Sequence, residues 1–309
     1  MNGLVRPATA CAAALALLLS CSTAPKKSDT VTVVRTQAAQ DGMTGDGYLR
    51  QGRYVLALQF FTQSLAEYTS LDDEEGIVAS YNAIGKTYMA MGSLDMAADM
   101  FQQAHDRAGR VSHSLLFAAS NNLGELALAR GDAAKALSIF QEALAMPPQS
   151  RTDQQAAVLY HNLGTAQRNL GNYPEALAWY QKSLDLNLSR KLTVEAASDY
   201  YMLASVRSLQ GSYEEAAKGV LQALELDKKV ENSPGIAQDL YALGLIARKR
   251  GDPSAAFDWF QRSYLVYTTI GMTTEIRKVL ADLIAVADGL GKTADADSYR
   301  AALAALGAP

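Results

Sequence analysis

Side chains that could support catalysis or bind a metal are few in this sequence, and their spacing does not favour either role. The three histidines are His105, His113 and His161, and no two of them lie four residues apart, as two ligands on one helical face would. The two cysteines, Cys11 and Cys21, lie close to the N-terminus, and the sequence contains no glycine-rich phosphate-binding loop. We therefore expect a protein that is not an enzyme and that has no metal site and no cofactor.

One run of acidic residues, Asp72-Asp73-Glu74-Glu75, could suggest a cation site. Carboxylates are also favoured where a helix begins, because the helix N-terminus carries a partial positive charge. We interpret this run as a solvated segment that leads into a helix.

The amino-acid composition argues against a disordered chain and against nucleic acid as a partner. The 309 residues are 49% hydrophobic, and 28 Lys and Arg stand against 32 Asp and Glu, which gives a formal net charge of −4. A disordered chain has lower hydrophobicity and higher net charge. A protein that binds nucleic acid needs an excess of basic residues to neutralise phosphates, so we expect no nucleic acid as a partner.

The N-terminus has the build of a secretory signal peptide, with Arg6 ahead of an apolar run that is too short to span a membrane. The run ends in Leu18-Leu19-Ser20-Cys21, which resembles the lipobox of bacterial lipoproteins. The resemblance implies a signal peptide over residues 1–20, lipidation of Cys21 and a tether over residues 21–37. An ordinary signal peptide with an incidental cysteine is the alternative. Ser22 favours the outer membrane, so we expect a chain anchored by lipid to the bacterial envelope and facing the periplasm.

The rest of the chain repeats one pattern with a period of 40 residues, shortened once to 39. Each repeat contains a glycine at a predicted turn, an alanine five residues later and, in most copies, an aromatic residue four residues after that. The glycines are Gly52, Gly92, Gly131, Gly171, Gly211, Gly251 and Gly291. The alanines are Ala57, Ala97, Ala136, Ala176, Ala216, Ala256 and Ala296. The last positions are Phe61, Phe101, Phe140, Tyr180, Val220, Phe260 and Arg300.

Each of these features has a physical reason. Glycine adopts a positive φ at low cost just after a helix ends. The alanine and the aromatic residue share one helical face, so the aromatic ring can pack beneath its neighbour. Each unit is thus a helical hairpin that cannot bury its apolar face alone and must stack on the next.

The segment Ile84-Gly85-x-x-Tyr88, followed by Ala97-x-x-x-Phe101, resembles the tetratricopeptide repeat family. The resemblance implies an all-α, right-handed superhelical solenoid of about seven hairpins over residues 38–309. The period departs from the family's usual length of about 34 residues. Arg300 breaks the pattern, as expected of a capping repeat. The expected repeats are residues 38–77, 78–116, 117–156, 157–196, 197–236, 237–276 and 277–309.

In this family the first helix of each hairpin lines a concave groove, and we expect a peptide or protein partner to bind there. The candidate groove residues are Asn82, Lys86, Asn121, Asn122, Glu125, His161, Asn162, Arg168, Tyr201, Tyr241 and Arg248. Amide side chains both donate and accept hydrogen bonds, so Asn122 and Asn162 could clamp an extended peptide backbone. We expect their replacement to weaken binding and to change stability little.

The sequence thus predicts a lipid-anchored scaffold or adaptor that holds a peptide segment or protein partner near the membrane. The alternative is a structural assembly factor of a secretion, pilus or other envelope complex. A short peptide bound in the groove would favour the first, whereas co-purification only within a large complex would favour the second.

Overall fold

The computed structural model describes residues 30–307, which form fourteen α-helices and one short 3-10 helix, with no strand in that range. The helices are α1 (Thr30–Arg50), α2 (Tyr54–Ser70), α3 (Glu74–Ala90), α4 (Leu94–Val111), α5 (His113–Ala129), α6 (Ala133–Ala145), η1 (Pro148–Ser150), α7 (Asp153–Asn169), α8 (Tyr173–Ser189), α9 (Thr193–Leu209), α10 (Tyr213–Lys229), α11 (Ser233–Lys249), α12 (Pro253–Ile270), α13 (Thr273–Gly289) and α14 (Thr293–Ala305). This confirms the all-α prediction.

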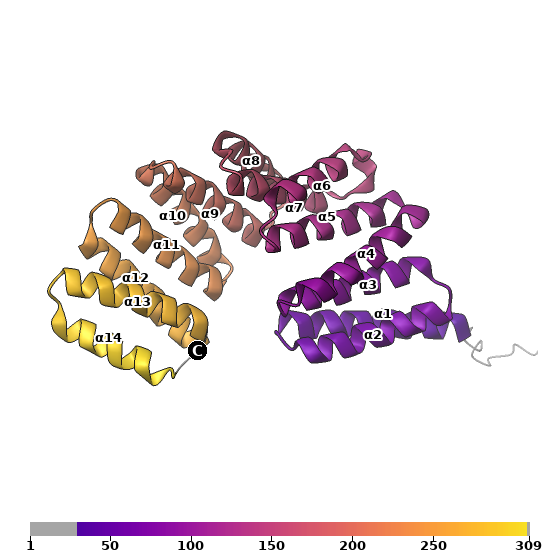
Figure 1. Cartoon of the computed structure of the whole chain (residues 1–309), viewed down its shortest axis with the longest axis horizontal. Helices are drawn as coiled ribbons and strands as arrows, with labels where there is room; N and C mark the ends of the chain where they lie inside the picture. The colour runs from indigo at the N-terminus through magenta and orange to yellow at the C-terminus, as the bar shows by residue number, and fades with distance from the viewer. Residues whose placement is uncertain (1–29, 308–309) are drawn as a thin grey trace, which may run out of the picture.

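The helices pair into seven hairpins that stack into an arch (Figure 1). The first helix of each hairpin has an odd number and the second has an even number. Consecutive first helices contact each other at α1 and α3, α3 and α5, α5 and α7, and α9 and α11, whereas consecutive second helices approach less closely. The first helices therefore follow the shorter, inner curve of the arch and line its concave side.

The turn inside each hairpin depends on its glycine. The seven predicted turn glycines all have positive φ, between 69° and 80°. At the α5–α6 turn the Asp132 backbone N–H donates to Ala127 O at 2.9 Å, and the Gly131 N–H donates to Leu128 O at 2.9 Å. These bonds close the end of α5, and the Asp132 carboxylate then accepts from Lys135 N at the start of α6.

Within most hairpins a glycine on the first helix faces an aromatic ring on the second. A Cβ added at Gly124 would lie 2.2 Å from the Phe140 ring, and one added at Gly164 would lie 2.7 Å from the Tyr180 ring. Where the first helix carries Ala204 instead, the second carries the smaller Val220. The two positions are matched in volume, as close packing requires.

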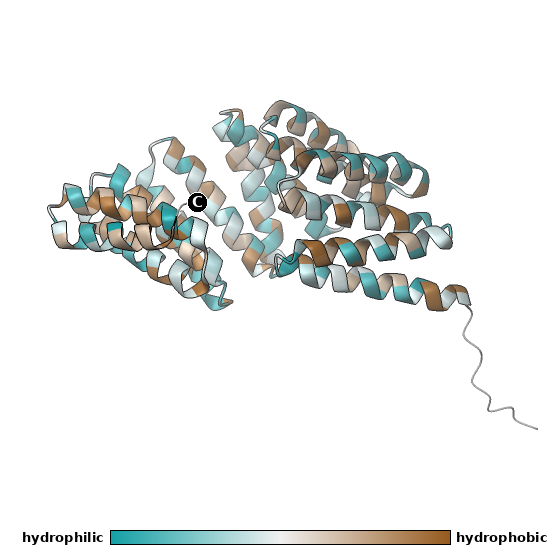
Figure 2. Ribbon diagram, turned by 60° about the horizontal axis from the view of Figure 1, so that its bottom comes forward, coloured by the Kyte–Doolittle hydropathy of each residue, from teal (hydrophilic) through white to brown (hydrophobic). Residues whose placement is uncertain are grey.

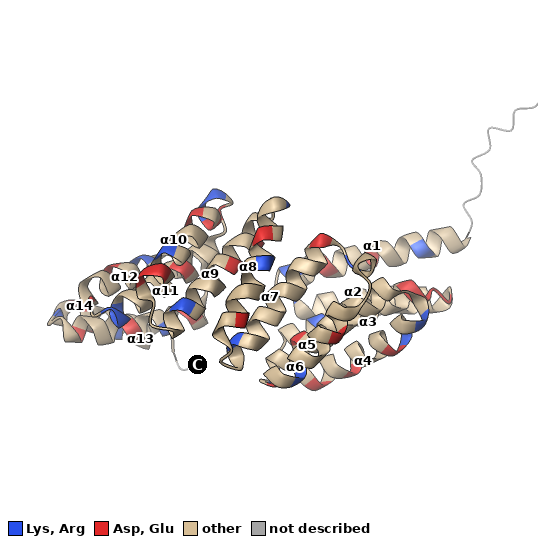
Figure 3. Ribbon diagram, turned by 90° about the horizontal axis from the view of Figure 1, so that it is seen from above, with Lys and Arg blue, Asp and Glu red and all other residues tan. Residues whose placement is uncertain are grey.

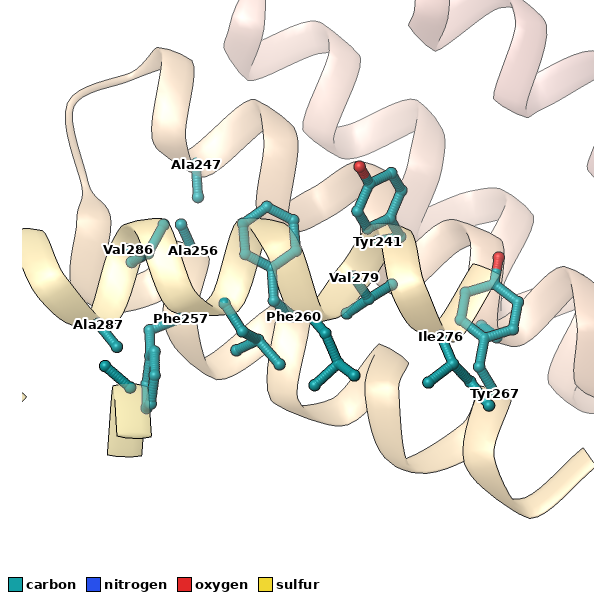
Figure 4. Packing of buried hydrophobic residues seen from close by; sticks show 14 residues of the cluster. Tyr241, Ala247, Ala256, Phe257, Phe260, Tyr267, Ile276, Val279, Val286 and Ala287 are labelled. Atoms are coloured by element: carbon teal, nitrogen blue, oxygen red, sulfur yellow. The ribbon is translucent and has the colours of Figure 1, made fainter. Parts of the chain in front are cut away.

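The predicted alanines, completely excluded from solvent, and the aromatic residues together form the core. Hydrophobic and hydrophilic residues alternate along the helices (Figure 2). Figure 4 shows this packing at the C-terminal end, where Phe260 of α12 lies beside Tyr241 of α11 and above residues of α13. In the last hairpin Arg300 points outward and pairs with Asp288 and Asp297, which confirms that this unit departs from the repeat pattern.

The first helix begins earlier than the sequence indicated. Residues 30–37 were expected to belong to a tether, yet α1 begins at Thr30. The threonines and valines of this segment have low helix propensity. A tertiary contact supports the helix, because Arg35 Nε donates to Asp73 Oδ2 of the next hairpin at 2.8 Å.

The acidic run at 72–75 leads into α3, as expected. Asp73 caps the helix by accepting from Gly76 N at 3.2 Å, and Glu74 pairs with Arg107 at 3.0 Å. Within residues 30–307 no group of three or more metal-ligating side chains occurs.

None of the helices in the described part of the chain is both long enough and apolar enough to cross a membrane. The predicted signal peptide and Cys21 lie outside the described residues.

Candidate functional site

Four of the candidate asparagines are buried and bond to one another along the inner curve. Asn122 Nδ2 donates to Asn82 Oδ1 at 2.7 Å, which joins α5 to α3. Asn162 Nδ2 donates to Asn121 Oδ1 at 3.2 Å and to Glu125 Oε1 at 2.9 Å, which joins α7 to α5. Glu125 also accepts from Asn121 Nδ2 at 2.8 Å. We call these five residues the asparagine ladder.

The asparagine ladder corrects the expectation that replacing Asn122 and Asn162 would change stability little. The amide nitrogens of Asn122 and Asn162 are engaged in bonds between repeats, and both side chains are at least nine-tenths buried. Removing them would leave buried polar partners unsatisfied, which costs stability. These amides therefore support the fold, and their role in binding a partner stays a prediction.

Farther along the arch, His161 takes part in a second polar network. Its Nδ1 lies 2.7 Å from Oδ1 of Asp199, a fully buried carboxyl group on α9. The other oxygen, Asp199 Oδ2, accepts from Asn187 Nδ2 of α8 at 2.7 Å. The network joins three helices of two hairpins at the α7–α9 junction.

Tyr241 and Arg248 converge on one carboxylate of the following repeat. The Tyr241 hydroxyl donates to Asp282 Oδ2, and Arg248 Nη1 donates to Asp282 Oδ1. The Lys278 ammonium lies 4.9 Å from the centre of the Tyr241 ring. Burial, together with the bond to Asp282, raises the pKa of the Tyr241 hydroxyl, which stays protonated and acts as a donor.

The inner side of the C-terminal half contains two adjoining cavities. One, of about 140 Å³, lies between α9 and α11 and is lined by Tyr201 and Leu245 among others. The other, of about 330 Å³, lies between α11 and α13 and is lined by the same two residues together with Tyr241 and Tyr267. We call the surface formed by these four residues the inner groove. Burial raises the pKa of Tyr267 to about 12, so this side chain is neutral.

A third cavity, of about 160 Å³, lies between α7 and α9 and is lined by His161, Asn187 and Glu195 among others. It lies where two first helices approach less closely, as α11 and α13 also do. Amides thus bridge the inner side between α3 and α7, and cavities open on it between α7 and α13.

The candidate residues therefore divide into separate groups. His161, Tyr201 and Tyr241 line the cavities, whereas Lys86 is exposed outside them. Arg168 lies near Met202, with Nη1 3.7 Å from the sulfur, and bonds to its neighbour Asn169.

Sequence reasoning missed Asp199, Asp282, Leu245 and Tyr267. For Asp199 a signal was available, because other repeats carry Leu159 or Val279 at the corresponding position. A carboxyl group at a core position calls for polar partners. Asp282, Leu245 and Tyr267 carry no such signal in the sequence, because their contacts depend on the distance between neighbouring hairpins.

Charge is distributed without a dominant sign. Figure 3 shows acidic and basic residues scattered over the helices instead of gathered on one face. Among the described residues, no face therefore carries a field of one sign that would steer a charged partner.

Solved structures with the same fold include several bacterial proteins. The quorum sensor NprR from B. thuringiensis is 16% identical, with a TM-score of 0.68, over 89% of this chain and 79% of that chain. A Rap protein complexed with Competence and Sporulation Factor is 15% identical, with a TM-score of 0.66, over 87% and 74%. PilW, a type IV pilus biogenesis factor, is 20% identical, with a TM-score of 0.56, over 79% and 98%. No curated protein matches the sequence.

The profile of the tetratricopeptide repeat matches the sequence four times, over residues 44–110, 76–149, 115–189 and 195–269. These matches cover more than half of the chain, and the seven stacked hairpins agree with them. The chain belongs to the tetratricopeptide repeat family.

Proposed function

We propose that this protein is a non-catalytic scaffold of the bacterial envelope that binds an extended peptide segment of a partner in its inner groove. The observation that carries the proposal is the pair of adjoining cavities between α9, α11 and α13, which share Tyr201 and Leu245. Two cavities joined through common wall residues can receive successive side chains of one extended segment.

The chemistry of the walls suits such a ligand. Tyr201, Tyr241 and Tyr267 combine large apolar rings with hydroxyl groups, a combination common where proteins bind one another. Glu275 and Lys278 border the same cavity and supply charges of both signs for polar parts of a peptide.

The structural neighbours support a peptide or protein as the ligand class. One is a Rap protein complexed with Competence and Sporulation Factor, and another is the quorum sensor NprR. Their low identity establishes a shared fold alone, so the choice of ligand for this chain depends on the groove residues.

A second candidate function is assembly of an envelope apparatus, supported by the fold shared with the pilus biogenesis factor PilW. That function would use the exposed surfaces of many helices. It predicts a stable multi-protein complex that forms even when the groove is blocked.

The lipid anchor is part of the proposal. Lipidation at Cys21 would leave a single acylated N-terminus, attached to the outer membrane and facing the periplasm, with the solenoid beyond it.

The test uses a displayed library of random short peptides, selected on the wild-type solenoid. Ser205 of α9 lines the cavity between α9 and α11, so Ser205→Phe should fill that cavity. We expect this variant to bind the selected peptides at least about tenfold more weakly, because the displaced side chain loses its burial.

The matched control is Ser138→Phe, the same substitution at an exposed position on the second helix α6. It should bind the peptides as the wild type does. Failure to select any peptide, or equal loss of binding in both variants, would contradict a groove-binding function. Capture of one large complex by wild type and Ser205→Phe alike would favour the assembly role.

A further inference from the structure

The cavity between α7 and α9 differs from the inner groove in its chemistry. Val158 and His161 of α7 form one side, Glu195 and Ser198 of α9 form the other, and Asn187 of α8 contributes to the wall. Its volume of about 160 Å³ suits one side chain better than a whole ligand.

Hydrogen bonding occupies one side of the imidazole in this cavity. Asp199 accepts from Asn187 through Oδ2, and its Oδ1 lies 2.7 Å from His161 Nδ1. Nδ1 of His161 is thus engaged with Asp199, and its other ring nitrogen, Nε2, has no hydrogen-bond partner among the described residues.

Two acceptors at this cavity lack donors. Asn187 directs Nδ2 to Asp199 and Ser183, and its buried Oδ1 has no hydrogen-bond partner within residues 30–307. Glu195 forms no ion pair within the same range. A buried acceptor without a donor is costly, and a carboxylate beside it makes the cavity electronegative.

Among the residues described, no lysine or arginine lines this cavity. Its walls offer acceptors from Asn187 and Glu195 beside the His161 ring, with the carboxyl group of Asp199 behind them. The complementary group is a cation that carries several N–H donors, which means an ammonium or a guanidinium.

The same positions in the neighbouring junctions keep only part of this character. One repeat later, Tyr201 replaces His161 and Gly235 replaces Glu195, while Asp227 and Asp239 stand in place of Asn187 and Asp199. Two repeats later, Glu275 keeps the carboxylate, but Lys278 lines the same cavity in place of Ser198 and supplies a positive charge of its own. The combination of His161, the unpaired oxygen of Asn187 and Glu195 in one cavity is therefore specific to the α7–α9 junction among the three.

We propose that the α7–α9 cavity binds the lysine or arginine side chain of the peptide that occupies the inner groove. This inference rests on the proposed function and adds a specificity to it. Continuity supports a peptide side chain as the occupant, because α9 contributes Glu195 to this cavity and Tyr201 to the inner groove. An extended segment that lies along α9 therefore passes both.

The experiment uses peptides selected from the random library on the wild-type solenoid. Each peptide that contains arginine or lysine is compared with a version carrying citrulline or norleucine, which are neutral and of similar shape. We expect a loss of roughly ten- to a hundredfold in affinity at one position, as for charge-assisted hydrogen bonds. In Glu195→Gln, which removes the charge and keeps the shape, that loss should shrink to a few-fold.

Glu215→Gln is the control, because Glu215 is an exposed carboxylate on the second helix α10. This variant should discriminate as the wild type does. Peptides that bind equally well with arginine and with citrulline would overturn the cation site, but not the proposed binding of a peptide in the inner groove. Failure to select any peptide would overturn both.

The ring signals of His161 give an independent readout by NMR, since the chain has only 3 histidines. The arginine peptide should shift them, and the citrulline peptide should not. An unmoved ring would overturn the proposal. A capped arginine alone that binds as tightly as the peptide would identify a site for small free cations and overturn the assignment to a peptide side chain.

Discussion

Asp239 occupies in α11 the position that Asp199 occupies in α9, and the two carboxyl groups have opposite surroundings. Asp199 receives hydrogen bonds from both neighbouring helices, whereas Asp239 Oδ2 is buried without a partner. In the later repeat the place of Asn187 is taken by Asp227, which repels a second negative charge. Burial, and then the charge of Asp227, raises the pKa of Asp239 to about 8.

The first prediction concerns pH. In the unfolded chain an aspartate ionises near its ordinary pKa of 3.8, whereas Asp239 in the folded chain keeps its proton until about pH 8. The folded state binds the extra proton, so this residue's contribution to stability decreases by about 1.4 kcal/mol per pH unit between these values and is lost above pH 8. Asp239→Asn removes the titration, and its amide could donate to Asp227.

Thermal unfolding of wild type and Asp239→Asn across pH 5 to 8 checks this prediction, with the variant gaining relative stability as pH rises. The control is Asp199→Asn, which replaces a carboxylate that already accepts two hydrogen bonds and should destabilise the fold. A constant difference between wild type and Asp239→Asn over that range would contradict the raised pKa.

The second prediction concerns the match between glycine and aromatic ring. Gly124→Ala should destabilise the fold by about 1–3 kcal/mol, because the added methyl group overlaps the Phe140 ring. The double variant with Phe140→Val recreates the Ala204 and Val220 pair of a later repeat. It should be more stable than the sum of the two single changes, with a coupling of about 0.5–3 kcal/mol, measured by denaturant unfolding. Additive effects would refute the matched packing.

The third prediction concerns turns between hairpins. Lys191 and Glu231 have positive φ values of 58° and 55°, and the corresponding residue of the next turn is Gly271 with φ 72°. Side chains with a Cβ are strained in this region, so Glu231→Gly should stabilise the fold by about 0.5–1 kcal/mol. Gly271→Ala should destabilise it by a similar amount. A lower melting temperature for Glu231→Gly and a higher one for Gly271→Ala would contradict the strain inferred at these positive-φ positions.

The fourth prediction concerns the asparagine ladder. Asn122→Ala leaves Asn82 Oδ1 without its donor in a buried position, and should cost about 1–3 kcal/mol of stability. Lys86→Ala, an exposed change on the neighbouring helix α3, serves as the control and should cost far less. Chemical denaturation of both variants provides the comparison, and equal stability would mean that the ladder contributes nothing.

The fifth prediction concerns membrane attachment. Cys21→Ser removes the only thiol that could be lipidated after cleavage of residues 1–20, so the protein should leave the membrane fraction. Fractionation of cells after a high-salt wash gives the readout. A serine variant that stays with membranes would contradict the lipobox interpretation.

The repeat pattern predicted the fold well because the physics of a solenoid is local. Gly131 specifies the turn of its hairpin, and Ala136 specifies a buried contact within the same hairpin. The residues that make these contacts lie close together in the sequence, so the repeat pattern identifies them. The early start of α1 was missed because it depends on a contact between Arg35 and Asp73 in different hairpins.

The site was predicted less completely. Repeat spacing placed His161, Tyr201 and Tyr241 on the inner side, and they do line cavities. The same spacing could not distinguish them from Asn122 and Asn162, because the distance between successive first helices decides whether an amide meets solvent or another amide. That distance varies from junction to junction while the period of 40 residues stays constant.

The asparagine ladder also has a mechanical consequence. A stacked solenoid under tension resembles a coil spring, and bonds along its inner edge set the stiffness of each turn. From α3 to α7 the ladder fastens successive turns, and farther along His161 with Asp199, Lys249 with Ser208, and Tyr241 with Asp282 fasten the next three junctions. A force that pulls the two ends apart therefore loads side-chain bonds at each junction from α3 to α13. The cavities between α7 and α13 would widen under load only after the bonds at their own junctions break.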